Sequence, residues 1–186
     1  MMATDQRTVT LTATEVAQAL DRLTDEIVAR HQDLTRLALV GIRTGGAFLA
    51  QRLGRLIQAR TGVTVPVGIL DITLYRDDWT RISHKPQVGK TELDFSLDDI
   101  DVVLVDDVLF TGRTVRAAMD ALTDFGRPRR MVLAVLVDRG GRELPICPDF
   151  VGQTVTLVGS QRVNVYLEEM GRPDEVVIET GPKNKG

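Results

Sequence analysis

The run VVLVDDVLFTGRT, from Val102 to Thr114, constrains the fold more than any other stretch of the chain. Its first four residues, Val102 to Val105, are apolar and mostly β-branched, which predicts a strand buried on both faces. Two acids, three apolar residues and a Thr-Gly-Arg-Thr loop follow. The next segment has the apolar spacing and the Gly-Pro stop of a helix, in Val115, Ala118, Met119, Leu122, Gly126 and Pro128. The run is therefore typical of a strand, a loop and a helix in an α/β sheet.

The loop Thr111 to Thr114 and the acids before it predict a site for a ribose 5-phosphate. The first N–H groups of a helix have no partner within the helix, and with the helix dipole they favour a phosphate. Gly112 lets the phosphate approach the backbone closely. Asp106 and Asp107 follow the strand, at the edge where open α/β sheets bind ligands, and paired carboxylates suit a vicinal diol. A simpler alternative, an acidic strand end beside an ordinary helix cap, explains Gly112 but not the paired acids.

Two similar patterns predict the rest of the sheet. Leu37 to Ile42 is a short buried strand that leads through the loop Arg43 to Gly46 into a helix, and Met131 to Val137 is another that ends in a charged loop. Strands that alternate with helices indicate an α/β fold, a doubly wound and mainly parallel sheet flanked by helices. The Gly-rich turn after Ile42 is also compatible with a turn that has no ligand. It lacks the patterns of a dinucleotide site or a P-loop.

The ends of the chain carry weaker signals. Thr12 and Glu15 have the spacing of a capping box at the start of a first helix, whose apolar face is Val16, Leu20, Leu23 and Ile27. Near the C-terminus, alternation in Val163 to Leu167 and the β-branched segment Val176 to Ile178 predict edge strands. We expect one domain over residues 1–180 and a disordered tail over 181–186.

The segment from Arg76 to Phe95 has no periodicity, and it follows a strand predicted over Val65 to Leu74. Loops of this length are uncommon in compact domains and are usually functional. Its cationic side chains suit a flexible flap that closes over an anionic substrate; they are Arg76, Arg81, Lys85 and Lys90. A hairpin with a solvated, charged surface is the alternative for its resting conformation.

Composition narrows the classes of partner. The chain has 186 residues, of which 43% are hydrophobic and 26% charged, with a formal charge of −3, so generic charge-driven binding to nucleic acid is not expected. The single Cys147 cannot form an internal disulfide, and the polar start has no apolar signal core. The longest apolar run, Met131 to Val137, is shorter than the ~20 residues of a membrane span. We therefore expect a cytoplasmic protein with small-molecule partners and no membrane contact.

The run from Val102 to Thr114 resembles the phosphoribosyl pyrophosphate (PRPP) signature of the type I phosphoribosyltransferases. Along most of the chain, the order GIRTGG, DITLYRDD, VDDVLFTGRT, GRPRR and LAVLVDRGGRELP is similar to the pyrimidine operon attenuation family. That resemblance implies a uracil phosphoribosyltransferase that uses PRPP and uracil to give UMP, with Mg²⁺ bound mainly through PRPP. It also implies UMP-dependent binding of pyr leader mRNA, which promotes transcription termination, and a homodimer or homotetramer.

The resemblance assigns roles to individual residues. It implies catalytic roles for Asp106, Asp107 and Arg76, and no protein metal site. The residues implied to bind PRPP are Arg43, Thr44, Gly45, Asp106, Asp107, Thr111, Gly112, Arg113 and Thr114. Those implied to border the base are Val137, Asp138 and Arg139, through backbone groups, and Phe150 and Val151, with Phe150 as the stacking aromatic.

The chain departs from the family at several of these places. The family usually has Arg where Gly45 stands, His where Gly141 stands, and a different segment from Gly152 to Val158. On the implied RNA face this chain has Asp21, Asp25, Gly141 and Cys147, which predicts weakened mRNA binding. Two alternatives to the uracil enzyme stay open: an RNA-binding attenuator with little activity, and a nucleotide-binding relic with altered base specificity.

Overall fold

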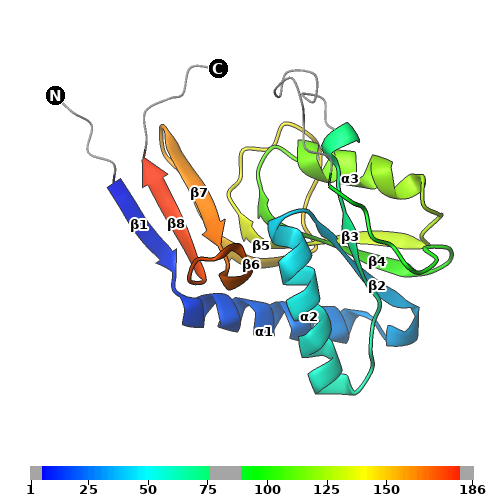
Figure 1. Ribbon diagram of the computed structural model, residues 1–186. Helices are drawn as coiled ribbons and strands as arrows, with labels where there is room; N and C mark the ends of the chain where they lie inside the picture. The colour runs from blue at the N-terminus through cyan, green and yellow to red at the C-terminus, as the bar shows by residue number, and fades with distance from the viewer. Residues whose placement is uncertain (1–5, 76–88, 181–186) are drawn as a thin grey trace.

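A computed structural model describes residues 6–75 and 89–180, and its centre is a five-stranded parallel sheet (Figure 1). The strands lie in the order β3-β2-β4-β5-β6. Their bounds are β2 Leu37–Ile42, β3 Val67–Leu70, β4 Asp101–Leu109, β5 Arg130–Asp138 and β6 Phe150–Thr154. The predicted parallel sheet is confirmed, and the strand predicted over Val102 to Val105 extends through both acids to Leu109.

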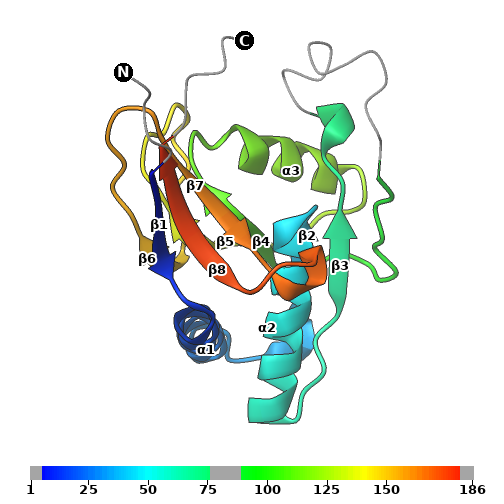
Figure 2. The ribbon, with the colours of Figure 1, turned by 60° about the vertical axis from the view of Figure 1, so that its left-hand side comes forward.

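Helices cover both faces of this sheet, as the doubly wound prediction requires (Figure 2). On one face, α1 (Ala13–Arg30) and α2 (Gly45–Thr61) bury their apolar sides against Val103 and Val105. On the other face, α3 (Arg113–Thr123) packs against Val102 and Leu104. Since side chains alternate along a strand, the four consecutive apolar residues of β4 supply both cores.

The helix ends test the local predictions. The capping box of α1 is confirmed, because the Thr12 N–H donates to Glu15 Oε2 at 2.8 Å and the Glu15 N–H donates to Thr12 Oγ1 at 3.5 Å. The predicted end of α3 is slightly late, since its C-cap is Asp124 rather than Gly126. Met119 was predicted to face the core but is 41% exposed, because the buried stripe of α3 runs through Ala117, Ala118, Ala121 and Leu122.

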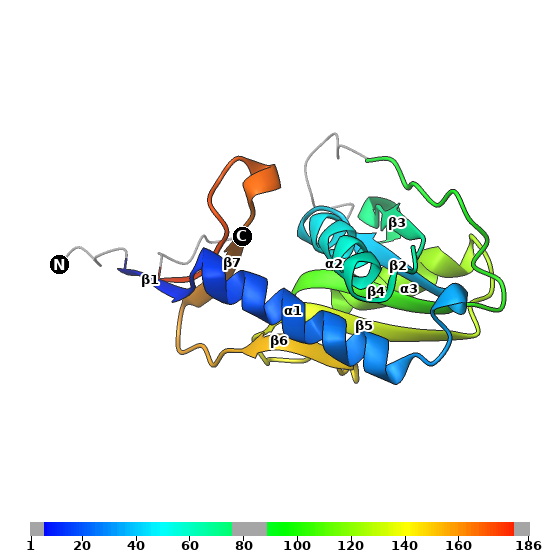
Figure 3. The same cartoon turned by 90° about the horizontal axis from the view of Figure 1, so that it is seen from below.

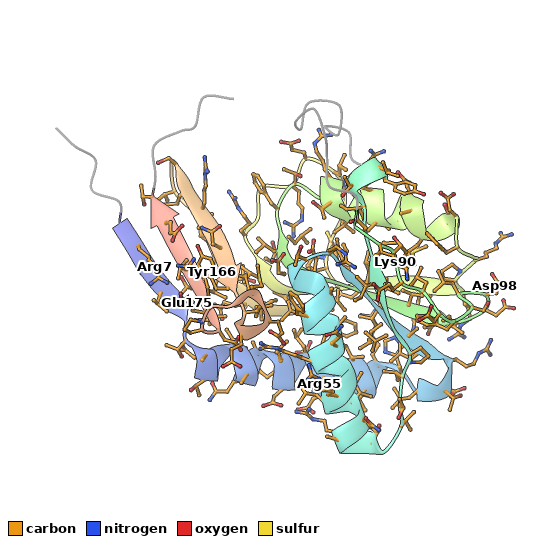
Figure 4. The ribbon with its side chains drawn as sticks, in the orientation of Figure 1. Arg7, Arg55, Lys90, Asp98, Tyr166 and Glu175 are labelled. Atoms are coloured by element: carbon orange, nitrogen blue, oxygen red, sulfur yellow. The ribbon has the colours of Figure 1, made fainter. Side chains whose placement is uncertain are left out.

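A second sheet, antiparallel and three-stranded, stands beside the first and was not predicted (Figure 1). Its order is β1-β8-β7, with β1 Gln6–Leu11, β7 Gln161–Tyr166 and β8 Glu175–Thr180. The segment Val176 to Ile178, predicted as an edge strand, lies in the central strand β8. Arg7, Tyr166 and Glu175, one from each strand, lie together on this sheet (Figure 4).

An arginine on α2 links the second sheet to the parallel-sheet unit. Arg52 pairs with Asp174, just before β8, and with Glu169 in the short 3₁₀ helix η4 (Glu168–Met170), at 2.6 Å in the latter case. Figure 3, seen from below, shows η4 and α2 on the same side of the molecule. Because α2 begins in the loop Arg43 to Gly46, this arginine connects the second sheet to the helix that carries that loop.

The strand predicted over Val65 to Leu74 is shorter, since β3 ends at Leu70 and a 3₁₀ turn, η2 (Thr73–Tyr75), follows. The last part of the predicted flap, residues 89–95, is attached to the sheet. Ile69 forms an antiparallel bridge with Glu92, and Leu93 and Phe95 pack against the α3-side core. The rest of the predicted flap, 76–88, and the tail 181–186 lie outside the described residues. No helix in the described part of the chain is long and apolar enough to cross a membrane.

Candidate functional site

The two acids at the end of β4 form the centre of the candidate site. Asp106 is 5% exposed and Asp107 is half-buried. The Asp107 N–H donates to Asp106 Oδ1 at 3.0 Å, and the Val108 N–H donates to Asp107 Oδ1 at 2.8 Å. Burial, and then repulsion by the Asp107 carboxylate, raises the pKa of Asp106 well above its usual range. No cationic side chain in the described ranges pairs with either acid, so both can receive a ligand.

The loop that opens α2 lies directly against these acids. A Cβ added to Gly45 would collide with Oδ2 of Asp107, and one added to Gly46 would collide with the Val105 carbonyl oxygen. Only glycines therefore permit this close approach without a shift of Asp107 or of β4. Thr44 is the N-cap of α2 and makes no side-chain cap bond, and the peptide bond between Arg43 and Thr44 is cis. The free N–H groups of the first turn of α2 thus begin beside the carboxylates.

The loop that opens α3 has the conformation of an anion cradle. Gly112 is its N-cap, with a φ of +90° that favours glycine. Thr111 Oγ1 accepts from the Arg113 N–H at 3.3 Å, and the Thr111 carbonyl accepts from the N–H groups of Glu143 and Leu144. These bonds fix the loop before the first helical turn, where unpaired N–H groups favour an anion. Thr114 is in that turn.

The predicted base-binding residues at the end of β5 are partly used within the protein. Val137 is fully buried, the Asp138 carbonyl accepts from the Val155 N–H at 2.9 Å, and the Arg139 N–H donates to the Leu109 carbonyl at 3.1 Å. The Asp138 carboxylate accepts from the Gly140 N–H and pairs with Arg142 at 2.7 Å. The polar groups of Asp138 therefore hold the loop after β5 in place.

Phe150 is buried in the core on the α1 side of the sheet, and its assignment as the stacking aromatic is corrected, whereas Val151 pairs with Val135, which is level with Asp106. Phe150 is 3% exposed in the α1-side core and pairs in register with Ala134, four residues before the carboxyl end of β5. Its ring centroid is 6.3 Å from that of His31. Ala134 is level with Val105, so Phe150 lies one residue row before Asp106, and it is the burial of its ring that excludes it as an open stacking surface.

Sequence reasoning missed Phe110, which follows β4 between the acids and the Thr111 loop. Its side chain is 41% exposed, and the Arg139 guanidinium carbon lies 3.7 Å from its ring centroid. The signal was present in the run VVLVDDVLFTGRT, where an aromatic residue stands at a loop position that a core does not require.

Arg76 of the predicted site lies outside the described residues. The returning end of the same segment is anchored on the site, because Arg43 Nη2 donates to the Lys90 carbonyl at 2.8 Å. The Gly89 N–H also donates to Asp71 Oδ2 at 2.6 Å, after β3. Arg43 therefore connects the loop before α2 to the end of the predicted flap.

Comparisons with known proteins identify the family of the chain. Residues 10–166 match the model of the phosphoribosyl transferase domain family. The Bifunctional protein PyrR of Syntrophobacter fumaroxidans is 56% identical over 171 residues, 92% of each chain. The protein of the same name from Thermus thermophilus is 55% identical over 168 residues, covering 90% of this chain and 93% of its own.

Solved structures show the same fold at low sequence identity. A hypoxanthine phosphoribosyltransferase from Staphylococcus aureus superposes with a TM-score of 0.68 at 20% identity, covering 95% of this chain and 93% of that one. The Trypanosoma cruzi hypoxanthine phosphoribosyl transferase gives 0.70 at 17% identity, with 98% and 95% covered. The whole-length match to the bifunctional proteins is the more specific finding, and the chain belongs to the phosphoribosyltransferase family and, within it, to the PyrR proteins.

Proposed function

We propose that the protein transfers the phosphoribosyl group of PRPP to uracil, giving UMP and pyrophosphate. The observation that carries the proposal is that two acids, with no cationic partner among residues 6–75 and 89–180, lie at one sheet edge with the N-terminal loops of α2 and α3. A diol, a pyrophosphate and a 5′-phosphate are the three groups of PRPP that such an arrangement would bind. Membership of the PyrR proteins supports this choice of reaction.

The residues have distinct tasks in this reaction. The bond from C1 to the pyrophosphate oxygen breaks, the bond from C1 to the base nitrogen forms, and the base loses its proton. Positive charge develops on the sugar between these events, and the carboxylates of Asp106 and Asp107 stabilise it. The loop Arg43 to Gly46 takes the pyrophosphate, while the loop Thr111 to Thr114 holds the 5′-phosphate and so fixes the sugar.

Mg²⁺ is the metal that we expect with PRPP. Asp106 and Asp107 are carboxylates without a cationic partner in the described part of the chain, so they fit beside a hard cation that prefers oxygen ligands. When bound, the ion neutralises charge on the pyrophosphate. Because Mg²⁺ keeps few protein ligands, PRPP would supply most of its oxygens.

An assay of PRPP consumption against a panel of bases tests this function. We expect turnover with uracil, with release of pyrophosphate, and little or none with hypoxanthine or guanine. Turnover only with a purine would contradict uracil as the substrate. Absence of turnover with every base would instead favour the nucleotide-binding relic.

The second proposed feature is weakened binding of pyr leader mRNA. Asp21 and Asp25 on the outer face of α1 both pair with Arg60 of α2, at 2.8 and 2.7 Å. Two of the other arginines, Arg129 and Arg130, are also engaged, since both pair with Asp101. Phosphate neutralisation by free Lys and Arg supplies much of RNA affinity, so these internal pairs support a low affinity.

A further inference from the structure

The burial of Phe150 leaves the candidate site without its predicted stacking aromatic. Phe110 is an exposed aromatic side chain at this edge, one residue beyond β4. It lies three residues after Asp107 and directly before Thr111, so it stands between the groups proposed to hold the ribose and the 5′-phosphate. A base attached to that ribose would be close to this ring.

Arg139 holds the ring of Phe110 from one side. Its guanidinium carbon lies 3.7 Å from the ring centroid, a distance at which the cation attracts the aromatic face. Nearby arginines pair with carboxylates, as Arg113 does with Glu143 and Arg142 with Asp138. Arg139 pairs with no carboxylate among the described residues, and its Nε is buried without a hydrogen-bond partner there. Its guanidinium lies over the ring of Phe110, and burial lowers the pKa of Arg139.

Gly141 completes the support of the ring. Its φ is +76°, and a Cβ at this position would lie 2.6 Å from Cε2 of Phe110. The Phe110 carbonyl also accepts from Arg142 Nη1 at 3.0 Å. The departure from the family at Gly141 therefore has a structural consequence: it leaves room for Phe110 to lie against the loop after β5.

We propose that Phe110 is the aromatic platform on which the nucleobase stacks, and that Arg139 is a positioning residue that holds the platform. Arg139 covers one face of the ring, and the exposed remainder is open to a base. This inference rests on the proposed function, because it assumes a ribose 5-phosphate that carries a base. It also names the substrate class more closely, as a nucleotide whose planar base stacks on an aromatic ring.

Two ligands that differ only by the base test the stacking role of Phe110 separately from the rest of the site. Calorimetry would measure UMP and ribose 5-phosphate, which differ only by the base, against the wild type and Phe110→Ala. We expect about tenfold weaker UMP binding, the usual scale of one base–aromatic stack, and unchanged ribose 5-phosphate binding. Phe110→Tyr should keep UMP affinity. The matched control is Phe125→Ala, which removes another exposed phenyl ring, 47% exposed and beyond the C-cap of α3.

The outcomes separate this inference from the function on which it rests. If wild-type protein binds UMP no tighter than ribose 5-phosphate, the proposed function fails, and the platform with it. If wild-type protein favours UMP and Phe110→Ala keeps that preference unchanged, only the platform is overturned. Equal losses of both ligands in Phe110→Ala would also overturn it, since that result describes a general structural role.

The role of Arg139 requires a double-mutant cycle. If Arg139 acts through Phe110, Arg139→Met should weaken UMP binding several-fold in the wild-type background. The double variant should then bind UMP only slightly more weakly than Phe110→Ala alone. Gly141→His should also weaken UMP binding, since its side chain needs the space of the ring. Arg127→Met is the matched control, because Arg127 is exposed and lies beyond α3. Fully additive losses would overturn the positioning role.

Discussion

Strand β4 carries a buried acid near each end, and the two acids have opposite surroundings. Asp101, at the first position, is 4% exposed and is bound by Arg129 and Arg130 at 2.8 and 3.0 Å. Asp106, near the other end, is 5% exposed and has a second carboxylate as its neighbour. Burial favours the protonated form at both places. At Asp101, hydrogen bonds from Arg129 and the charge of Arg130 outweigh burial and lower the pKa.

Within one strand, Asp101 therefore shows the surroundings of a structural acid and Asp106 those of an acid that is kept for a ligand. A buried charge with good partners is what folding alone produces, whereas a buried acid beside another acid costs stability. Such a cost persists where a ligand later supplies the missing charges, so the end of β4 with Asp106 marks the site. The predictions below test this comparison.

The largest effect is expected from Asp107→Asn. Its carboxylate faces the loop before α2, and replacing it removes negative charge from the developing cation on the sugar. We expect turnover to fall roughly 10²-fold or more, the scale of losing one electrostatic contact in a transition state. Asp120→Asn on the exposed side of α3 is the control, and it should leave steady-state rates unchanged. Equal rates in Asp107→Asn and wild type would remove the distinction between the two ends of β4.

Most of the site could be predicted from the sequence because its chemistry is local. The acids and the Thr111 loop lie within thirteen consecutive residues, and one strand–loop–helix unit places them. The stacking aromatic could not be predicted, because it depends on which face of the sheet a side chain takes. Phe150 is level with Val105, next to Asp106, yet its ring is buried in the α1-side core, and neither segment carries a marker of that orientation.

The parallel sheet was predictable for the same local reason, whereas the antiparallel sheet was not. Strand β1 pairs with β8, so Gln6 lies opposite Thr180 across almost the whole chain. The alternation of Thr8, Val9, Thr10 and Leu11 was an available signal for β1, but four residues of alternation do not identify a partner strand. The pairs between Arg60 and the acids of α1 are likewise long-range, and sequence spacing alone does not reveal them.

A smaller effect is expected at the other end of the strand, and it concerns stability. Asp101→Asn keeps the shape of the side chain but removes the charge that Arg129 and Arg130 share. We expect the free energy of unfolding to fall by about 2 kcal/mol, the scale of hydrogen bonds to a charged group. Denaturant titration would measure it, with Asp120→Asn as the control. A loss below about 0.5 kcal/mol would mean that Asp101 is no better satisfied than a surface acid.

At Asp106, in contrast to Asp101, replacing the acid is expected to raise the free energy of unfolding. Because its folded pKa is raised, the protonated group favours folding most at pH values below the unfolded pKa of about 3.9, and this contribution is lost as pH rises through the folded pKa. Asp106→Asn removes the buried charge, and its Oδ1 can still accept from the Asp107 N–H. The variant should be about 1 kcal/mol more stable than wild type at pH 8, with a smaller gain at pH 5. Thermal unfolding at both pH values measures this, and a gain that grows toward acid would contradict it.

The smallest effect concerns RNA and the outer face of α1, where acids are paired in the manner of Asp101. Asp21 and Asp25 both pair with Arg60 of α2. Wild-type protein with UMP present should bind the organism's own pyr leader transcript no tighter than about 10⁻⁶ M at physiological salt, and much tighter binding would contradict the proposed loss.

Neutralising both acids should recover part of that affinity. Asp21→Asn with Asp25→Asn frees Arg60 and removes two charges that repel phosphates, so we expect filter binding to tighten several-fold, because exposed ion pairs contribute little each. The matched control, Asp98→Asn with Asp120→Asn, makes the same change of net charge on the opposite side of the parallel sheet, next to and on α3. If both double variants tighten equally, the gain reflects net charge alone. If only Asp21→Asn with Asp25→Asn tightens binding, the two paired acids of α1 are the cause of the weak RNA affinity of this surface.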